Sequence, residues 1–139
     1  MTLKQTTIRK AVSVSGVGLH TGVTATLTFK PAPENHWYKF QRVDLPNKPI
    51  IDVDVDNVVD TSRGTTLMQH GAKVSTTEHA LAALVGLQID NVIIEIDGPE
   101  VPIMDGSSRP FLEALEQAGI VEQNAPKNIF VLNENLSYE

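Results

Sequence analysis

Glu78 and His79 are adjacent residues whose side-chain types could together perform chemistry. They stand at the start of an Ala- and Leu-rich run over residues 76–88, TTEHALAALVGLQ, which predicts a buried helix because it is apolar on nearly every side. At a helix N-terminus, both side chains can reach one site beyond the helix end. A histidine that binds a metal, beside a glutamate that handles the metal-bound water, is a recurring arrangement in hydrolases.

A structural interpretation of the same pair stays open. Ser75 lies three residues before Glu78, and this S-x-x-E spacing is typical of the capping box that begins a helix. Glu78 also suits the positive end of the helix dipole. Zinc needs about three protein ligands, and the remaining histidines of the chain have no H-x-x-x-H spacing with His79. The residues alone are therefore compatible with either a metal-dependent hydrolase site or a helix cap.

Two loop motifs carry further polar side chains. The glycine-rich motif GVGLHTG, residues 16–22, predicts a tight connection between two strands. It has neither the G-x-G-x-x-G spacing nor the G-x-x-x-x-G-K-[ST] ending of a phosphate loop. Asp105, within MDGSS at residues 104–108, is either a site carboxylate or part of a turn that precedes a helix.

Composition excludes several classes of protein. The 17 acidic residues outnumber the 11 Lys and Arg residues, so we do not expect the protein to bind nucleic acid through its phosphate groups. The absence of cysteine excludes disulfides and thiolate zinc sites. The apolar runs are shorter than the roughly 20 residues of a membrane span, and the N-terminus lacks the apolar region of a signal peptide. We expect a soluble, cytoplasmic domain.

Alternation of apolar and polar residues predicts the elements that position these side chains. Strands are predicted over residues 6–15, 23–30, 36–43, 50–56, 65–69 and 91–97, with a hairpin turn at His70 and Gly71. Within residues 50–56, Ile51, Val53 and Val55 are expected to face inward. A second helix is predicted to be capped by Ser107 or Ser108, with Pro110 in its first turn, and to end before Gly119.

This element order predicts an α+β fold. We expect a two-layer sandwich, in which a mainly antiparallel or mixed sheet of about five strands carries two helices on one face. Residues 1–119 are interpreted as one domain and the polar residues 120–128 as a linker. Residues 129–139 are interpreted as the first strand of a second domain that is cut short. The chain is accordingly expected to be truncated.

Taken together, the motifs resemble those of a known family. The segments GVGLHTG at 16–22, STTEHALAAL at 75–84 and PIMDGSS at 102–108 carry the resemblance, with Asp90 and Asn91 before an apolar strand. They resemble the N-terminal domain of the UDP-3-O-acyl-N-acetylglucosamine deacetylase (LpxC) family from near residue 4 to the end. The resemblance implies two related α+β domains with the active site between them.

The same resemblance implies a reaction and residue roles. The family removes the N-acetyl group of UDP-3-O-acyl-N-acetylglucosamine in the lipid A (lipopolysaccharide) biosynthesis of Gram-negative bacteria. It implies that His79 is a ligand of Zn²⁺ and that Glu78 is the general base acting on the zinc-bound water. The remaining zinc ligands are implied to lie in the second domain. The positions with implied supporting or substrate-binding roles are His20, Thr61, Ser62, Arg63, Gly64 and Asp105.

The position of Gly64 departs from the family pattern. Many relatives have a cysteine where Gly64 aligns, which puts an inhibitory second metal in doubt here. Two other hypotheses remain: a non-catalytic module that packs against or binds a partner, and a different zinc hydrolase on the same scaffold. For residues 1–139 alone we expect no deacetylase activity, no tight zinc and an exposed apolar patch that favours self-association.

Overall fold

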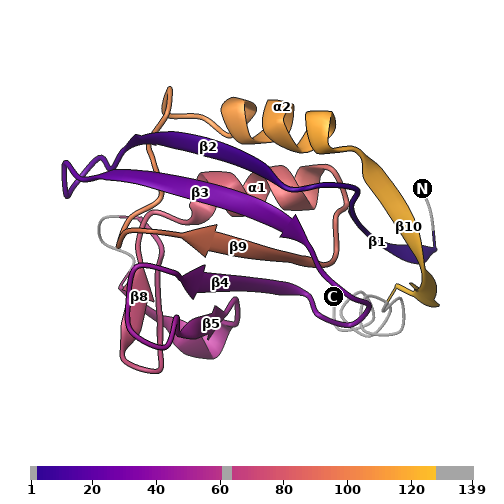
Figure 1. Ribbon diagram of the computed structural model, residues 1–139, viewed down its shortest axis with the longest axis horizontal. Coiled ribbons are helices and arrows are strands. Elements are labelled where there is room, and N and C mark those ends of the chain that lie inside the picture. Colours follow the sequence, from indigo (N-terminus) through magenta and orange to yellow (C-terminus); the bar gives the residue numbers. More distant parts are fainter. Residues whose placement is uncertain (1–2, 61–63, 128–139) are drawn as a thin grey trace, which may run out of the picture.

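The computed structural model describes residues 3–60 and 64–127, and its main feature is one five-stranded sheet with two helices packed on it (Figure 1). The α+β sandwich is thereby confirmed. The strands are β1 (Lys4–Ile8), β2 (Val12–Val17), β3 (Thr24–Pro31), β4 (Tyr38–Arg42), β5 (Ile50–Asp52), β6 (Val58–Asp60), β7 (Thr66–Gln69), β8 (Ala72–Val74), β9 (Val92–Ile96) and β10 (Ile120–Pro126). The helices are α1 (Glu78–Gly86) and α2 (Arg109–Ala118), with a short 3₁₀ turn, η1, at Val55–Asn57.

The main sheet has the strand order β2-β3-β9-β4-β5. Its neighbours are antiparallel except β4 and β9, which run parallel. The predicted alternation holds in β3, where Ala25, Leu27 and Phe29 are buried. Phe29 meets Phe111 of α2 edge to face, with ring centroids 6.4 Å apart. The core therefore lies between this face of the sheet and the two helices.

Helix α1 begins without the predicted capping box. Glu78 is the first helical residue, so the residue three positions after the cap is Ala80, which has no side-chain acceptor. Thr77 occupies the cap position and makes no side-chain cap bond. Ser75 lies outside the helix, where its hydroxyl accepts a 3.1 Å hydrogen bond from Thr66. The capping-box prediction was wrong because a left-handed residue, Thr76, turns the chain between Ser75 and the helix.

The outer side of α1 is apolar and open to solvent. Ala82 and Gly86 are exposed, and 64% of the surface of Val85 is accessible. Exposed apolar faces of this kind are common at interaction surfaces. The expected self-association stays a prediction.

Two predicted strands are shorter than expected. The run 6–15 is divided between β1 and β2, which belong to different sheets. The alternation at 50–56 gives only β5, because the Asp54 carboxylate accepts the N–H of Asp56 and starts the turn η1. Val55, expected to face inward, is 81% exposed as a result.

Residues 120–126 form strand β10 instead of a linker, and β10 pairs antiparallel with β1. Its sequence is polar because its residues alternate between exposed and half-buried positions. The last two residues of the predicted linker are Lys127, which is described, and position 128, which is not. Residues 128–139 lie outside the described part, so the proposed domain division stays a prediction.

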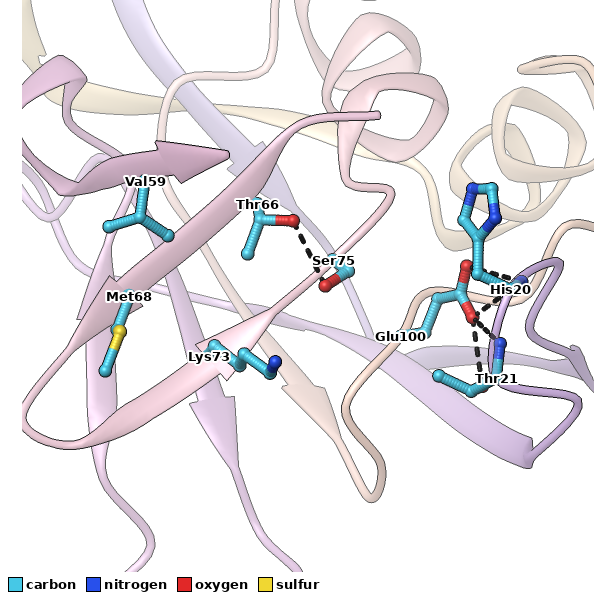
Figure 2. Close-up of a pocket in the computed structure, with 8 residues that line it drawn as sticks. All are labelled: His20, Thr21, Val59, Thr66, Met68, Lys73, Ser75 and Glu100. Atoms are coloured by element: carbon cyan, nitrogen blue, oxygen red, sulfur yellow. Dashed lines mark hydrogen bonds between the residues drawn. The ribbon is translucent and has the colours of Figure 1, made fainter. Parts of the chain in front are cut away.

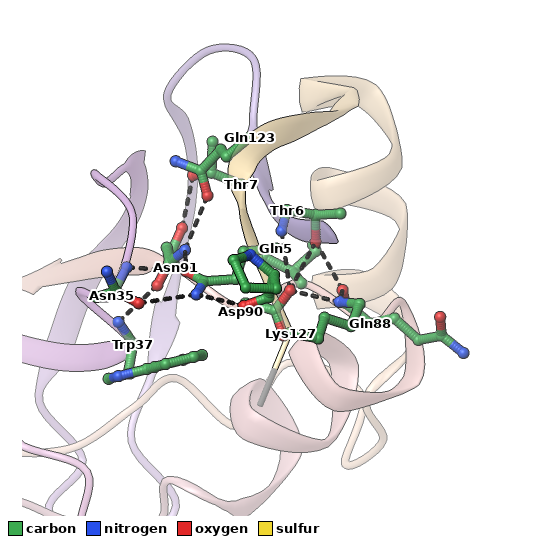
Figure 3. A network of polar contacts seen from close by, with 12 residues as sticks. Gln5, Thr6, Thr7, Asn35, Trp37, Gln88, Asp90, Asn91, Gln123 and Lys127 are labelled. Atoms are coloured by element: carbon green, nitrogen blue, oxygen red, sulfur yellow. Dashed lines mark hydrogen bonds and ion pairs between the residues drawn. The ribbon is translucent and has the colours of Figure 1, made fainter. Parts of the chain in front are cut away.

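A buried polar network fastens β1 and β10 to the start of β9 (Figure 3). Asn91 is fully buried, and its amide N–H groups donate to Gln5 and Gln123, each at 2.8 Å. The side-chain oxygen of Asn91, Oδ1, accepts a hydrogen bond from the N–H of Trp37 at 2.7 Å. Asp90 accepts the N–H of Thr6 at 2.8 Å and forms an ion pair with Lys127. The Asp90-Asn91 motif therefore holds the two terminal strands in place.

Candidate active site

Glu78 and His79 lie half-buried in the first turn of α1. The segment before β7 is hydrogen-bonded to this turn through both the N–H and the carbonyl oxygen of Thr65. Thr65 donates its N–H to Oε1 of Glu78 at 3.1 Å, and its carbonyl oxygen accepts the N–H of Thr77 at 3.2 Å. The Thr77 hydroxyl donates to the same carbonyl oxygen at 3.3 Å. The Glu78 carboxylate is thus held at the helix N-terminus, where the helix dipole favours its negative charge.

The hairpin predicted at His70 and Gly71 explains why this segment reaches α1. Both residues have positive φ, 54° and 77°, and they join Gln69 and Ala72, which are opposite each other in β7 and β8. Only residues 75–77 separate β8 from α1, so the hairpin brings Thr65 back to the helix start.

Gly64 approaches the Glu78 carboxylate closely. A Cβ at this position would lie 2.9 Å from Oε2 and 3.2 Å from Oε1 of Glu78, and Gly64 has a φ of +91°. Both the contact and the backbone conformation favour glycine at this position. Thr61, Ser62 and Arg63, predicted to line the site with Gly64, lie outside the described residues.

His20 and Thr21 line a cavity of about 340 Å³ near the same end of the fold (Figure 2). The lining residues come from the β2–β3 turn, the β6–β7–β8 sheet and the loop after β9; they are His20, Thr21, Val59, Thr66, Met68, Lys73, Ser75 and Glu100. Ser75 and Thr66 connect this cavity to the segment that precedes α1. The structure thus places the predicted residue His20 on a cavity whose lining includes neither Glu78 nor His79.

Glu100 is a functional candidate that the sequence analysis missed. Only 1% of its surface is accessible, yet its carboxylate accepts hydrogen bonds from His20, Thr21 and Thr76. Burial acts to raise the pKa of Glu100, and these hydrogen bonds outweigh it, so the pKa lies below the ordinary value. A single glutamate between Pro99 and Val101 belongs to no spacing motif, so no sequence pattern could have identified it.

Gly18 explains part of the glycine-rich motif. A Cβ on Gly18 would lie 2.3 Å from Oε1 of Glu100 and 2.7 Å from the hydroxyl of Thr21. The tight β2–β3 connection is also closed by backbone hydrogen bonds from Gly18 to Val23 and from Gly22 to Gly18. The motif therefore lets the turn wrap around a buried carboxylate.

Asp105 lies apart from this cavity and is exposed. Its carboxylate accepts the N–H of Ser107 at 3.0 Å and the Ser107 hydroxyl at 2.6 Å. The hydroxyl bond is the main reason that the pKa of Asp105 lies below its ordinary value. These contacts form the turn before α2, where Ser107 in turn accepts the N–H of Arg109. A supporting role for Asp105 stays a prediction.

A zinc site needs about three protein ligands. Over residues 3–60 and 64–127, no group of three or more His, Asp or Glu side chains could hold a metal ion. Within this part of the chain, His79 is therefore not joined by the two further ligands that would complete such a site. In the same part, neither helix has the length and apolarity needed to cross a membrane.

Comparisons with a family model and with known proteins point to the same family. Residues 5–139 match the family described as UDP-3-O-acyl N-acetylglycosamine deacetylase (LpxC). The bifunctional enzyme LpxC/FabZ of Chlorobaculum tepidum is 53% identical over 138 residues, which cover 99% of this chain and 30% of that protein. The bifunctional enzyme LpxC/FabZ of Bacteroides thetaiotaomicron is 48% identical over 136 residues, 98% of this chain and 30% of that protein.

A relative named as a deacetylase alone is similar to about the same extent. The UDP-3-O-acyl-N-acetylglucosamine deacetylase of Myxococcus xanthus is 49% identical over 133 residues, which cover 96% of this chain and 42% of that protein. The chain therefore spans less than half the length of each of these relatives.

Proposed function

This chain belongs to the UDP-3-O-acyl N-acetylglycosamine deacetylase family, and from this premise we propose that it is the N-terminal half of a zinc-dependent deacetylase. The proposed reaction is hydrolysis of the N-acetyl group of UDP-3-O-acyl-N-acetylglucosamine, a step of lipid A biosynthesis in the cytoplasm. The remaining zinc ligands are proposed to come from a second domain of the same polypeptide. Residues 1–139 alone are then expected to release no acetate.

The observation that supports this proposal best is the hydrogen bond between the Thr65 N–H and Glu78, one residue before His79. The bond uses one of the lone pairs of the Glu78 carboxylate, so the carboxylate it holds can still accept a proton. His79 follows in the same first turn of α1. A proton acceptor and a metal ligand are thus offered from one rigid helix end, as a hydrolase site requires.

Zinc, when bound, would polarise the acetyl carbonyl and lower the pKa of a coordinated water to about 7. Glu78 would take one proton from the water as the water oxygen bonds to the carbonyl carbon. The C–N bond would then break, and Glu78 would pass the proton to the departing nitrogen. The products are acetic acid and the free amine of the sugar; the acid then gives its proton to the amine or to water and becomes acetate, so atoms and charge balance.

His79 is assigned the metal-binding role, and other polar residues are assigned supporting ones. His20 lines the cavity of about 340 Å³ and is proposed to contact substrate there. Gly64 leaves space for the Glu78 carboxylate. We also propose supporting or substrate-binding roles, which rest on the family resemblance, for Thr61, Ser62, Arg63 and Asp105.

The test uses the full-length protein loaded with zinc. Glu78→Gln keeps the size of the side chain and removes the base, so kcat should fall by about 10²- to 10⁴-fold while zinc content is unchanged. His79→Ala should lower zinc content as well as kcat. His70→Asn is a control at an exposed turn position with positive φ, which asparagine tolerates.

The outcomes separate the hypotheses. Full turnover by Glu78→Gln would remove the base assignment. Unchanged zinc content in His79→Ala would favour the non-catalytic module, which binds a partner or packs in the fold without a metal. Equal acetate release from unrelated N-acetyl sugars would favour a different zinc hydrolase on this scaffold.

A further inference from the structure

Glu100 connects two parts of the candidate active site that are far apart in sequence. Its carboxylate accepts hydrogen bonds from the β2–β3 turn, which carries His20, and from Thr76, two residues before Glu78. We propose that Glu100 is a positioning residue of the active site, which fixes both the start of helix α1 and the turn that carries His20. This inference rests on the proposed function.

The first side of the contact is made by Thr76. Its hydroxyl donates to Oε2 of Glu100 at 2.7 Å, and Thr76 is buried. Its φ is +58°, a left-handed conformation that is costly for a β-branched residue and persists only where neighbouring structure imposes it. Thr76 is the residue that turns the chain from β8 into α1. The hydrogen bond to Glu100 therefore helps hold a strained residue immediately before Glu78 and His79.

The backbone around Thr76 is held against the same loop. Ser75 donates its N–H to the carbonyl oxygen of Pro99 at 2.9 Å and accepts the N–H of Val101 at 3.0 Å. Glu100 lies between these two partners, so its side chain adds a third contact at the same place. The start of α1 is thus set by the loop that follows β9.

The second side of the contact is made by the β2–β3 turn. Oε1 accepts the N–H and the hydroxyl of Thr21, both at 2.9 Å, and the N–H of His20 lies 3.1 Å from each carboxylate oxygen. Gly18 makes room for this approach, because a Cβ there would lie 2.3 Å from Oε1. One carboxylate therefore sets where the His20 backbone lies relative to α1 (Figure 2).

Hydrogen bonds alone surround the charge of Glu100. None of the ion pairs found over residues 3–60 and 64–127 involves this residue. Backbone N–H groups cannot become acceptors, whereas the Thr76 hydroxyl can reverse its role. Glu100→Gln should therefore keep its oxygen on the β2–β3 turn and direct its amide N–H to Thr76. This variant should fold. Glu100→Ala, by contrast, loses the hydrogen bonds to both the β2–β3 turn and Thr76.

Thr76 gives the sharpest test in the full-length zinc enzyme. Thr76→Val keeps the branched shape and replaces the hydroxyl by a methyl group, and we expect kcat to fall by about 10- to 100-fold with little change in KM, as for a slight misplacement of catalytic groups. Thr76→Ser restores the hydroxyl and should recover most of kcat. Equal losses in Thr76→Val and Thr76→Ser would overturn the proposal.

Hydrogen exchange measured by mass spectrometry gives a readout that does not depend on turnover. Thr76→Val should speed exchange in peptides covering residues 76–84 only, and Glu100→Ala should speed it there and in residues 16–23. Unchanged exchange in both segments of Glu100→Ala would also overturn the proposal. A wild-type enzyme without deacetylase activity would instead refute the proposed function, and the exchange result would still decide the role of Glu100.

Discussion

Gly64 lies so close to the carboxylate of Glu78 that a Cβ at position 64 would crowd it. The distance from a Cβ at position 64 to Oε2 of Glu78 would be 2.9 Å, which real Cβ contacts essentially never show. The Glu78 carboxylate is held in this position by the N–H of the residue after Gly64, Thr65. A side chain at position 64 must therefore move either the β7 segment or the proposed catalytic base.

Gly64→Ala in the full-length enzyme is expected to lower both stability and activity. The positive φ should reduce the free energy of unfolding by about 1–3 kcal/mol. Displacement of the Glu78 carboxylate should reduce kcat by about tenfold or more. Urea unfolding and steady-state acetate release measure the two effects separately.

Gly71→Ala is the matched control for Gly64→Ala. Gly71 has a φ of +77°, and a Cβ there would meet nothing within 4 Å. It should therefore show a similar loss of stability with normal kcat. A comparable fall in kcat for both variants would mean that contact with Glu78 is not the cause.

Asn91→Asp tests the buried network at the two terminal strands. The substitution replaces the amide N–H groups that donate to Gln5 and Gln123 by an acceptor and a charge. Gln5 cannot reverse its amide without losing its own donations to Asn35 and Pro126. We expect the free energy of unfolding to fall by about 2–4 kcal/mol.

The control for this network is Asn124→Asp, at an exposed position of β10. It makes the same chemical change and should alter the free energy of unfolding by about 0.5 kcal/mol or less. Both values come from urea titrations at neutral pH. A loss below about 1 kcal/mol for Asn91→Asp would contradict the role given to the network.

The depressed pKa of Glu100 predicts how stability depends on pH. Because its folded-state pKa lies below the unfolded value near 4.5, Glu100 stabilises the fold above that pH. This contribution is lost as pH falls through the folded pKa. Glu100→Gln should therefore flatten the loss of stability below pH 4.5 and leave the slope unchanged near neutrality.

Urea midpoints of wild type and Glu100→Gln measured from pH 7 to pH 3 check this dependence. Glu116→Gln, at an exposed position of α2, is the control and should follow wild type. If the acid slopes of wild type and Glu100→Gln coincide, the hydrogen bonds from Thr21, Thr76 and His20 do not favour the charged form as inferred.

Much of the fold could be predicted from local patterns. The alternation at Ala25, Leu27 and Phe29 identified a central strand, and Pro110 and Gly119 bracketed α2. A polar segment was misinterpreted where the strand that it pairs with lies far away in the sequence. The residues at 120–126 appeared in sequence as a linker, but they pair with β1, more than a hundred positions earlier in the chain.

Some residues of the candidate site could likewise be predicted from the sequence and others could not. Glu78, His79 and His20 stand in motifs that are visible along the chain, and Gly64 was named through the family resemblance. Glu100 stands in no such motif, because its partners Thr21 and Thr76 are 79 and 24 residues away in sequence. Periodicity cannot report hydrogen bonds of that range.

The sequence by itself determined the residue types that could perform hydrolysis, the apolar helix that carries them and the family that they resemble. Only the tertiary structure decided how Glu78 is held, because its donor, the Thr65 N–H, comes from a segment that the β7–β8 hairpin returns to the helix. It also decided that a buried carboxylate, Glu100, fixes the turn before that helix. The physical reason is that a side chain's chemistry is local, whereas its hydrogen-bond partners and its room to move are set by chain segments that meet only on folding.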